Sequence, residues 1–312
     1  MNPNYQSTLA VIITAYKNEN LTINYVKNEL CKIKLKHVII IVNNEATNES
    51  NLLLSNKLRA VIINNIYSET IPVSSIYIIN NPVNSGFAKG NNIGTIFAVK
   101  NFTPQHILFS NTDIKFLCDN IVEKLIEKIN ITPEAGIIGP KVIGLKGESQ
   151  SPEPFISFKD KHILMPISSP FYSKRKKEKK FQLNYSKEAK EGFHYKVMGS
   201  FFIVNVKDFL ECGMMDPNTF LYAEEMILSE RMKSIGKKVY YDPSVTVLHE
   251  HGATTSKHMK WNKSSDIGFN SECYYYRTYI KTPIWEIHIG KFIHFLYKNI
   301  KYEKARLFNH GS

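Results

Sequence analysis

The chain has 312 residues, of which 43% are hydrophobic, a composition typical of folded globular proteins and ample for a large core. Lysine and arginine outnumber the acids by 40 to 28, and the net charge of +12 favours anionic partners (nucleotides, nucleic acid or an anionic membrane surface) without choosing among them. The four cysteines have no paired spacing, which argues against a disulfide framework or a structural zinc site and favours a reducing cytosol: Cys31, Cys118, Cys212 and Cys273.

The N-terminus and the apolar stretches bear on location. Residues 1–7 lack a basic region followed by an apolar core, so we expect no secretory signal. No uninterrupted apolar stretch is long enough to cross a bilayer, so we expect a protein that is soluble or at most peripheral. The length suggests either two domains or one α/β domain with an appendage.

Four apolar runs in the first 110 residues predict buried strands, at 9–14, 37–42, 76–79 and 107–109. Residues 20–33, between the first two runs, have the amphipathic pattern of a helix. Strands joined by a helix imply a right-handed crossover and a parallel sheet. The alternation therefore predicts a Rossmann-like nucleotide-binding half.

The loops after these strands exclude some nucleotide-binding motifs and suggest another. Residues 14–19 contain no glycine, so we do not expect NAD or FAD there, and no Walker-type Gly-Lys-Ser/Thr follows any strand. Residues 80–94 are rich in Asn and Gly, and we expect a helix from Phe87 onward. Its first N–H groups, with Lys89 nearby, could bind a diphosphate; the alternative is a capping loop with small residues for close packing.

The second half is predicted to combine short strands with a long loop. Residues 150–193 have a loop-like composition and contain the basic run 174–180, which is either a solvated, mobile segment or a contact for anionic lipid or an acceptor phosphate. Nucleic-acid binding has no supporting module such as a zinc finger or an RNA-recognition signature. We expect a helix from Glu224 to about Ser234, and strands at 136–142, 197–204, 239–241 and 246–248.

One apolar run ends abruptly in polar residues. After 107–109 the chain reads Ser110, Asn111, Thr112 and Asp113, as expected for a buried strand that carries a carboxylate just past its tip. Ligands bind outside the carboxyl ends of strands in open α/β sheets, and Mg²⁺ and Mn²⁺ favour carboxylate oxygens. Asp113 is therefore a candidate metal ligand at a phosphate site, although the same pattern suits a turn residue or a helix N-cap.

Two further features could share a pocket with Asp113. The acids Glu224 and Glu225 open a predicted helix, and His249 and His251 follow a predicted strand, where alternate residues face the same side. A histidine after a strand is more often packed or on the surface, and the helix dipole alone favours Glu at a helix start. Together the three features supply metal ligands and a carboxylate base, as displacement of a phosphate leaving group requires.

The order of six motifs resembles glycosyltransferase family 2, most closely its bacterial rhamnosyltransferase-like enzymes with the GT-A fold. The motifs are Thr-x-Tyr after the first strand, Asn-x-Gly-Phe-Ala-x-Gly-Asn-Asn, a strand ending in Asn-x-Asp, Gly-Ser-Phe-Phe-Ile, Phe-Leu-Tyr-x-Glu-Glu followed by Arg, and His-x-x-Gly. The resemblance covers roughly residues 9–256. It implies an α/β GT-A fold, with a Rossmann-like, mostly parallel sheet flanked by helices.

The resemblance also implies an activity. The family performs an inverting transfer of a sugar from a nucleotide-diphosphate donor, here UDP- or dTDP-linked, with Mg²⁺ or Mn²⁺. By resemblance Asp113 and His249 bind the metal, Glu225 is the catalytic base and Glu224 is its motif neighbour. The donor nucleotide is expected to contact Thr14, Tyr16, Asn43, Lys89, Asn111 and Asp113.

Three of these positions depart from the usual family pattern. Asn43 stands where an Asp commonly contacts the pyrimidine base, and it can still accept a hydrogen bond but carries no charge. Asn111 replaces the first Asp of the Asp-x-Asp-type motif, which reduces the negative charge at the cation. Glu225 replaces an Asp, and the extra methylene is expected to preserve the base chemistry.

We expect residues 1–260 to form the GT-A domain, with a nucleotide-binding half at 1–115 and an acceptor-binding half at 116–260. Residues 261–312 are expected to form a helical, aromatic extension. In that extension residues 283–298 interleave aromatic and basic residues, and they either pack on the core or lie on a membrane interface. The implied acceptor is a glycan or a polyprenyl-linked glycan in bacterial surface polysaccharide assembly, and the implied location is the cytoplasm or the inner face of the plasma membrane.

Other functions are compatible with parts of the pattern. A nucleotidyltransferase on a similar fold would need a Gly-rich basic signature after the first strand, which residues 14–19 do not supply. A non-catalytic nucleotide-sugar-binding protein would keep the site without turnover. Retention on heparin or RNA at moderate salt would instead indicate a nucleic-acid binder.

Overall fold

The computed structural model describes residues 8–168, 171–173, 176, 178–179, 181–250 and 261–309, leaving aside the side chains of 261–262 and 300–309. Its strands are β1 (Leu9–Tyr16), β2 (His37–Asn44), β3 (Val61–Ile63), β4 (Ile76–Asn81), β5 (His106–Ser110), β6 (Ile114–Phe116), β7 (Ala135–Gly144), β8 (Gly192–His194), β9 (Phe201–Asn205) and β10 (Lys238–His249). Its helices are α1 (Glu19–Asn28), α2 (Asn48–Leu58), α3 (Gly86–Phe102), α4 (Ile121–Asn130), α5 (Met165–Ser168), α7 (Tyr185–Glu188), α8 (Val206–Glu211), α9 (Glu224–Ser234), α11 (Trp261–Thr278) and α12 (Ile284–Asn309), with a 3₁₀ turn η1 (Leu30–Lys32) and a π-helical turn η2 (Lys159–Leu164).

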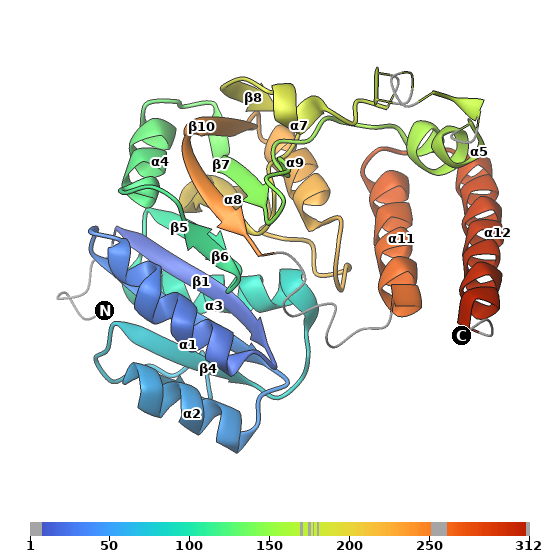
Figure 1. Ribbon diagram of the computed structural model, residues 1–312. Helices are drawn as coiled ribbons and strands as arrows, with labels where there is room; N and C mark the ends of the chain where they lie inside the picture. The colour runs from blue at the N-terminus through green and yellow to red at the C-terminus, as the bar shows by residue number, and fades with distance from the viewer. Residues whose placement is uncertain are drawn as a thin grey trace.

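One sheet runs through the centre of the molecule (Figure 1), in the order β3-β4-β2-β1-β5-β9-β7-β10-β6, with β8 beside β10. Strands β1 to β5 pair in parallel, and β7 pairs in parallel with β10. Strand β9 is antiparallel to both β5 and β7, so it joins the two parallel groups. The carboxyl ends of β1, β2, β4, β5, β7 and β10 consequently meet at one edge, where β9 begins.

Helices cover both faces of the sheet because the apolar strands offer side chains to both. Leu9, Val11 and Ile13 of β1 pack in a cluster with α1, α2 and α4, whereas the alternate residues Ala10 and Ile12 pack with α3, α8 and α9. This is the alternation that a strand buried on both faces requires. The result is a three-layer α/β body (Figure 1).

A third cluster attaches the last two helices. It includes Phe269 and Tyr276 of α11 and Ile287 of α12, together with Phe158 before η2 and Ile227 of α9. Figure 1 shows α11 between the sheet and α12, so α12 forms the outer edge on that side. Within the described part of the chain, no helix is both long and apolar enough to cross a membrane.

The four strands predicted in the first half are present, and each extends beyond its predicted range. The predicted helix at 20–33 ends earlier, at Asn28, and continues as η1. The short elements α2, β3 and β6 were not predicted, because two of them are three-residue strands and α2 has little amphipathic pattern.

Several predictions for the second half were wrong in detail. The strand expected at 197–204 begins only at Phe201, because the backbone groups of Gly199 and Ser200 bond outside the ladder. The strands expected at 239–241 and 246–248 are one strand, β10, with an irregularity between Asp242 and Thr246 that accommodates Pro243, which has no N–H to donate. The loop expected at 150–193 contains η2, α5, α7 and β8, since Phe158 anchors this segment in the third cluster.

Candidate active site

Asp113 and His249 meet at the carboxyl edge of the sheet. β5 ends at Ser110 and β6 begins at Ile114, so Asp113 lies in the short connection between them. His249 is the last residue of β10 and pairs with Ile114 across the antiparallel β6–β10 ladder. The Nε2 atom of His249 is 3.4 Å from Oδ1 of Asp113, and the Glu250 N–H donates to the Asp113 carbonyl at 2.9 Å. Strand pairing thus brings together the two residues predicted to bind a metal.

A third residue fixes the orientation of the histidine ring. Nδ1 of His249 is 2.8 Å from Oε1 of Gln150. An amide oxygen can only accept a hydrogen bond, so Nδ1 donates to it, and Nε2 is the nitrogen that faces Asp113 and would be the one to bind a metal. Metal-ligating histidines characteristically use their second nitrogen in this way.

The pair fits a Mg²⁺ or Mn²⁺ ion that takes its other ligands from a diphosphate and water. One carboxylate oxygen and one imidazole nitrogen converge, and both side chains are mostly enclosed, with 10% of Asp113 and 5% of His249 exposed. Among the described residues, no three or more His, Cys, Asp or Glu side chains come together in a way that could hold a metal ion. His251, which could add a ligand, lies outside the described residues.

A two-residue turn connects this metal edge to the predicted base. Before β9, the carbonyl of Ser200 accepts the N–H of Asn111 at 2.8 Å, and the N–H of Gly199 donates to Oε1 of Glu225 at 3.0 Å. A Cβ atom at Gly199 would lie 2.2 Å from that same Oε1, so only glycine leaves room for the carboxylate. Asn111 and Glu225, which come from opposite halves of the chain, are therefore bonded to adjacent residues.

The helix that carries the two glutamates begins at an unusual turn. Tyr222 and Ala223 both have left-handed backbones, with φ of 72° and 69°, directly before α9. Such non-glycine residues cost on the order of 1–3 kcal/mol each, and they persist where the surrounding structure imposes them. The turn places Glu224 and Glu225 in the first turn of α9, where the helix dipole favours carboxylates.

The two carboxyls have different environments. Glu224 is 6% exposed and its Oε1 has no hydrogen-bond partner among the described residues, whereas Glu225 accepts the Gly199 N–H. Burial first, and then the charge of Glu225, raise the pKa of Glu224 well above the usual range of a carboxyl. Of the two, Glu225 is the one held by a donor and partly open to solvent.

A buried cation stands near the two glutamates. Nζ of Lys196 lies 2.7 Å from Oε1 of Glu153, and only 12% of its side chain is exposed. The backbones of Lys196 and Glu153 also bond to each other in both directions. Burial lowers the pKa of Lys196, but the charges of Glu153 and Glu225 outweigh it and the net shift is upward. Lys196 is therefore a fixed positive charge that acts on Glu225.

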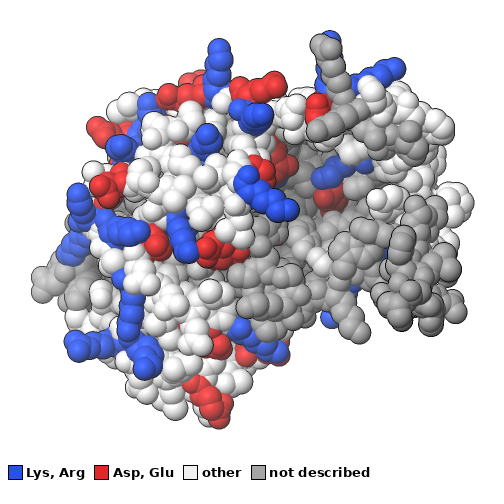
Figure 2. Space-filling model, viewed as in Figure 1, with Lys and Arg blue, Asp and Glu red and all other residues white. Residues whose placement is uncertain are grey.

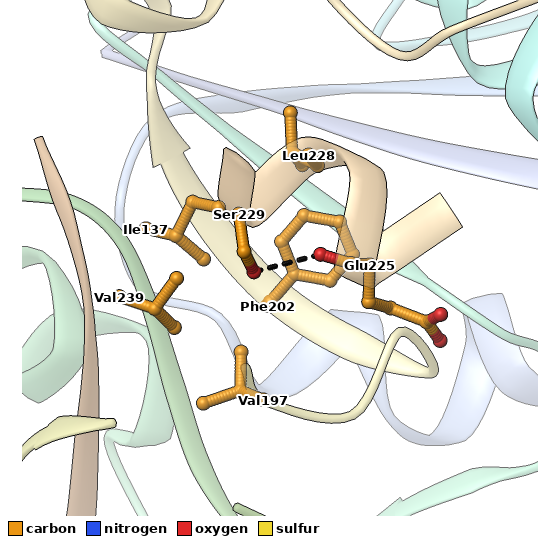
Figure 3. A pocket seen from close by; sticks show the side chains of 7 residues that line it. All are labelled: Ile137, Val197, Phe202, Glu225, Leu228, Ser229 and Val239. Carbon is orange, nitrogen blue, oxygen red and sulfur yellow. Dashed lines mark hydrogen bonds between the residues drawn. The ribbon is translucent and has the colours of Figure 1, made fainter. Parts of the chain in front are cut away.

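Behind Glu225 lies a small apolar pocket (Figure 3), with a cavity volume of about 10 Å³. The close-up shows the Glu225 carboxylate pointing away from this pocket, while Ser229 reaches back toward the Glu225 backbone. Ser229 Oγ donates to the Glu225 carbonyl at 2.7 Å. This hydrogen bond stabilises the helix turn that carries Glu225. The pocket is lined by Ile137, Val197, Phe202, Glu225, Leu228, Ser229 and Val239.

Solved structures provide the comparison for this arrangement. A mannosyltransferase from Pyrobaculum calidifontis, solved with GDP-Man and Mn²⁺, matches 93% of this chain and 75% of its own, with 11% identity and a TM-score of 0.51. TarS of S. aureus matches 87% of this chain but only 40% of its own, with 10% identity and a TM-score of 0.50. The chain has the GT-A fold. No protein-family model and no curated sequence matches it.

In this GT-A fold the residues predicted to bind the nucleoside, Thr14, Tyr16 and Asn43, lie in the last residues of β1 and β2. Thr14 Oγ1 donates to Oδ1 of Asn91 at 3.0 Å, and Tyr16 ends β1 with its N–H bonded to Oδ1 of Asn18. Nδ2 of Asn18 donates to Thr112 at 2.8 Å, which links the loop after β1 to the loop that holds Asp113. Thr14 and Tyr16 therefore lie at the same edge of the sheet as the metal pair.

Asn43 is more enclosed than a nucleotide contact requires. It is 2% exposed, and its amide group donates to Ser50 Oγ and to Asn51 Oδ1, both at 2.9 Å. The structure shows no open approach to this side chain, and its contact with the nucleotide base stays a prediction.

The start of α3, for which the sequence left open a diphosphate contact or a capping loop, contacts the second half of the chain. The N–H of Phe87 donates to the carbonyl of Phe220 at 3.0 Å. Gly86 has φ of 79°, and a Cβ there would lie 2.2 Å from that carbonyl oxygen. Lys89 is exposed on the first turn of α3. Its contact with the donor phosphates remains a prediction.

Sequence reasoning missed three residues of the site: Gln150, Lys196 and Gly199. Gly199 belongs to the Gly-Ser-Phe-Phe-Ile motif, so its position was marked although its role was not. Gln150 and Lys196 lie in segments without a pattern and far from their partners along the chain. In Figure 2 basic and acidic side chains are interspersed over the α/β body, so surface charge alone does not single out this edge.

Proposed function

We propose that the chain is an inverting, metal-dependent glycosyltransferase that moves a hexosyl or deoxyhexosyl group from a nucleotide-diphosphate sugar to an acceptor hydroxyl. The observation that supports this most directly is the turn before β9. It bonds Asn111, two residues from Asp113, on one side and Glu225 on the other. A metal pair for a diphosphate and a carboxylate base for a hydroxyl are what this transfer needs.

In the proposed reaction Glu225 takes the proton of the acceptor hydroxyl. The acceptor oxygen attacks the anomeric carbon from the face opposite the nucleotide, and the bond from that carbon to the diphosphate breaks. Lys196, held by Glu153, is a buried positive charge near this carboxylate. Glu224 is the buried neighbour that supports the helix turn.

The leaving diphosphate is proposed to lie against the opposite side of the site. Asp113 and His249 would hold a Mg²⁺ or Mn²⁺ ion, which supplies charge neutralisation for the departing phosphates when it is bound. Lys89 and Asn111 are proposed to contact the diphosphate. Thr14, Tyr16 and Asn43 are proposed to bind the nucleoside of a UDP- or dTDP-linked donor.

The acceptor is proposed to be a glycan or a polyprenyl-linked glycan of bacterial surface polysaccharide, with the enzyme in the cytoplasm or at the inner face of the plasma membrane. A rhamnosyltransferase-like donor choice follows from the motif order in the sequence. The GT-A fold shared with a mannosyltransferase that was solved with GDP-Man and Mn²⁺ supports a nucleotide-sugar donor and a metal. TarS extends well beyond the part that this chain matches, so the activity of TarS does not support a particular acceptor for this chain.

The proposal is tested with a panel of nucleotide sugars and Mn²⁺. A bound donor raises the melting temperature by mass action, which identifies the nucleotide before any acceptor is known. With that donor, Glu225→Gln should reduce sugar transfer or donor hydrolysis by about 10²-fold or more. It should keep donor affinity, because the base acts on the acceptor.

The matched control is Glu211→Gln, an exposed glutamate at the end of α8. It should leave both binding and turnover unchanged. Normal turnover in Glu225→Gln would overturn the base assignment. Donor binding without turnover in the unmodified chain, across the whole panel and a set of acceptors, would indicate a binding protein instead.

A further inference from the structure

Helix α12 packs on the rest of the chain along one narrow side. Ile287 is 2% exposed, and a Cβ atom at Gly290 would lie 2.5 Å from the ring of Phe158. One turn further along, the ring of His294 stacks on Phe269 with centroids 4.1 Å apart. Contacts that recur every three or four residues define a single face of a helix. The opposite face has to be accounted for separately.

That opposite face is apolar and exposed. Large apolar side chains at 285, 289, 292 and 296 recur along it at a helical spacing, with Ile284 and Phe295 at its flank, and each of the six is between 42% and 62% exposed. Large apolar side chains exposed together on one helix face mark an interaction site, since scattered single residues would be the ordinary finding. We call this set the α12 face: Ile284, Trp285, Ile289, Phe292, Phe295 and Leu296.

The charges around the α12 face are positive. Lys281 and Lys291 are exposed, and Lys291 lies one turn before Phe295 on the same side. The one acidic residue from 281 to 299 is Glu286, which is half-buried. On the packed side, Lys298 is paired with Asp266 at 2.5 Å.

A neighbouring segment extends the same character. Turn η2 packs against α12 and continues into α5, where Ile167 is 53% exposed; Phe171, after α5, is 83% exposed. Lys176 and Lys179 of the basic run are exposed as well. Figure 1 shows this segment beside the beginning of α12. At that edge of Figure 2 the described residues are mostly white, which means that few of them are charged.

We propose that the α12 face lies in the interfacial layer of an anionic lipid membrane, with Lys281 and Lys291 at the headgroups. Aromatic side chains with flanking lysines are the composition that settles at a bilayer surface. The helix meets this surface sideways, because no helix among the described residues is suited to cross a membrane. A second copy of the chain fits less well, since each copy has a net charge of +12 and would bring its own lysines to the contact.

The test is binding of the full chain to vesicles of phosphatidylcholine with and without phosphatidylglycerol. We expect co-sedimentation with the anionic vesicles, weakened by salt.

Phe292→Ser/Phe295→Ser should lower the partition coefficient by about tenfold or more. Lys281→Glu/Lys291→Glu should remove the preference for anionic lipid. The matched control is Leu52→Ser/Val83→Ser, which changes residues that are 55% and 65% exposed in the nucleotide-binding half and should bind like the unmodified chain.

A spectroscopic measurement reports on the face directly. The chain has two tryptophans, Trp261 and Trp285, so Trp261→Phe leaves Trp285 as the only reporter. Its emission should shift to shorter wavelength on anionic vesicles. Unchanged binding of Phe292→Ser/Phe295→Ser, or no binding of the unmodified chain, would overturn the proposal. If light scattering shows a dimer of the unmodified chain and a monomer of Phe292→Ser/Phe295→Ser, the face belongs to a second copy instead. Each of these measurements is independent of sugar transfer.

Discussion

The two halves of the sheet edge differ in how they bury polar side chains. The first half, at the ends of β2 and β4, is built from neutral amides: Asn43, Asn44, Asn80 and Asn81. The second half buries charges, with Lys196 against Glu153 and with Glu224 beside Glu225. Neutral amides are stabilised by hydrogen bonds to one another, whereas buried charges need opposite charges close by.

The amides form a connected network. Asn43 donates to Asn51, which donates to Asn80 at 2.9 Å, and Asn80 donates to Asn64 at 3.0 Å. Such a network holds a fixed shape and has no group that titrates between pH 5 and 8. The charged half has groups whose protonation can change, which is consistent with the proton transfer proposed for Glu225.

The largest expected effect comes from Gly199→Ala in the charged half. A Cβ atom 2.2 Å from Oε1 forces the Glu225 carboxylate to move. Because a misplaced catalytic group can cost about 100-fold in rate, we expect kcat to fall by about that factor with donor affinity retained. Steady-state kinetics and a donor titration measure the two quantities. Glu225→Asp in the Gly199→Ala background shortens the side chain and should recover part of the rate; an unchanged kcat in the single variant would argue against a strict placement.

Asn43→Ala is expected to have an intermediate effect, on stability. It leaves the buried Oδ1 of Asn51 without its Asn43 donor, whereas Ser50 Oγ still accepts the N–H of Thr47, and the loss costs about 1–3 kcal/mol in the free energy of unfolding. Since no member of the network titrates, the loss should be the same at acidic and at mildly alkaline pH. Urea denaturation measures it, with the exposed Asn56→Ala on α2 as the control, expected within about 0.5 kcal/mol of the unmodified chain. A loss that varies with pH would contradict the description of this half as neutral.

Glu224→Gln is expected to have the smallest effect, and in the opposite direction. The pKa of Glu224 is raised by folding, so the folded chain binds the proton more tightly than the unfolded chain. Its stability therefore falls as pH rises from the usual pKa of a carboxyl to the raised one. A neutral glutamine removes this loss, so the variant should match the unmodified chain near pH 4 and exceed it by about 1 kcal/mol or more near pH 8. Thermal denaturation at both pH values checks this, and a difference that is equal at both would show that charge is not the cause.

Much of the first half followed from the sequence, because a strand buried on both faces is written as a continuous apolar run. The runs near Ile12, Ile40 and Leu108 therefore predicted three parallel strands. The second half was harder to predict from the sequence, since its key contacts are backbone hydrogen bonds of Gly199 and Ser200, which no pattern of side chains encodes. The roles given to Asp113, His249 and Glu225 are still predictions, although Asp113 and His249 lie 3.4 Å apart in the fold.

By itself the sequence determined the α/β class and the strand that leads to Asp113, because buried strands are written as apolar runs. It also indicated the helix that begins at Glu224, and the order of its motifs implied the GT-A fold. Tertiary structure alone decided which of these residues meet. The antiparallel β9 brings Gly199 between Asn111 and Glu225, and it places the buried Lys196 near the carboxylates. It also left one apolar face of α12 exposed among the described residues. These contacts join residues far apart along the chain, so their energies arise only when the sheet has formed.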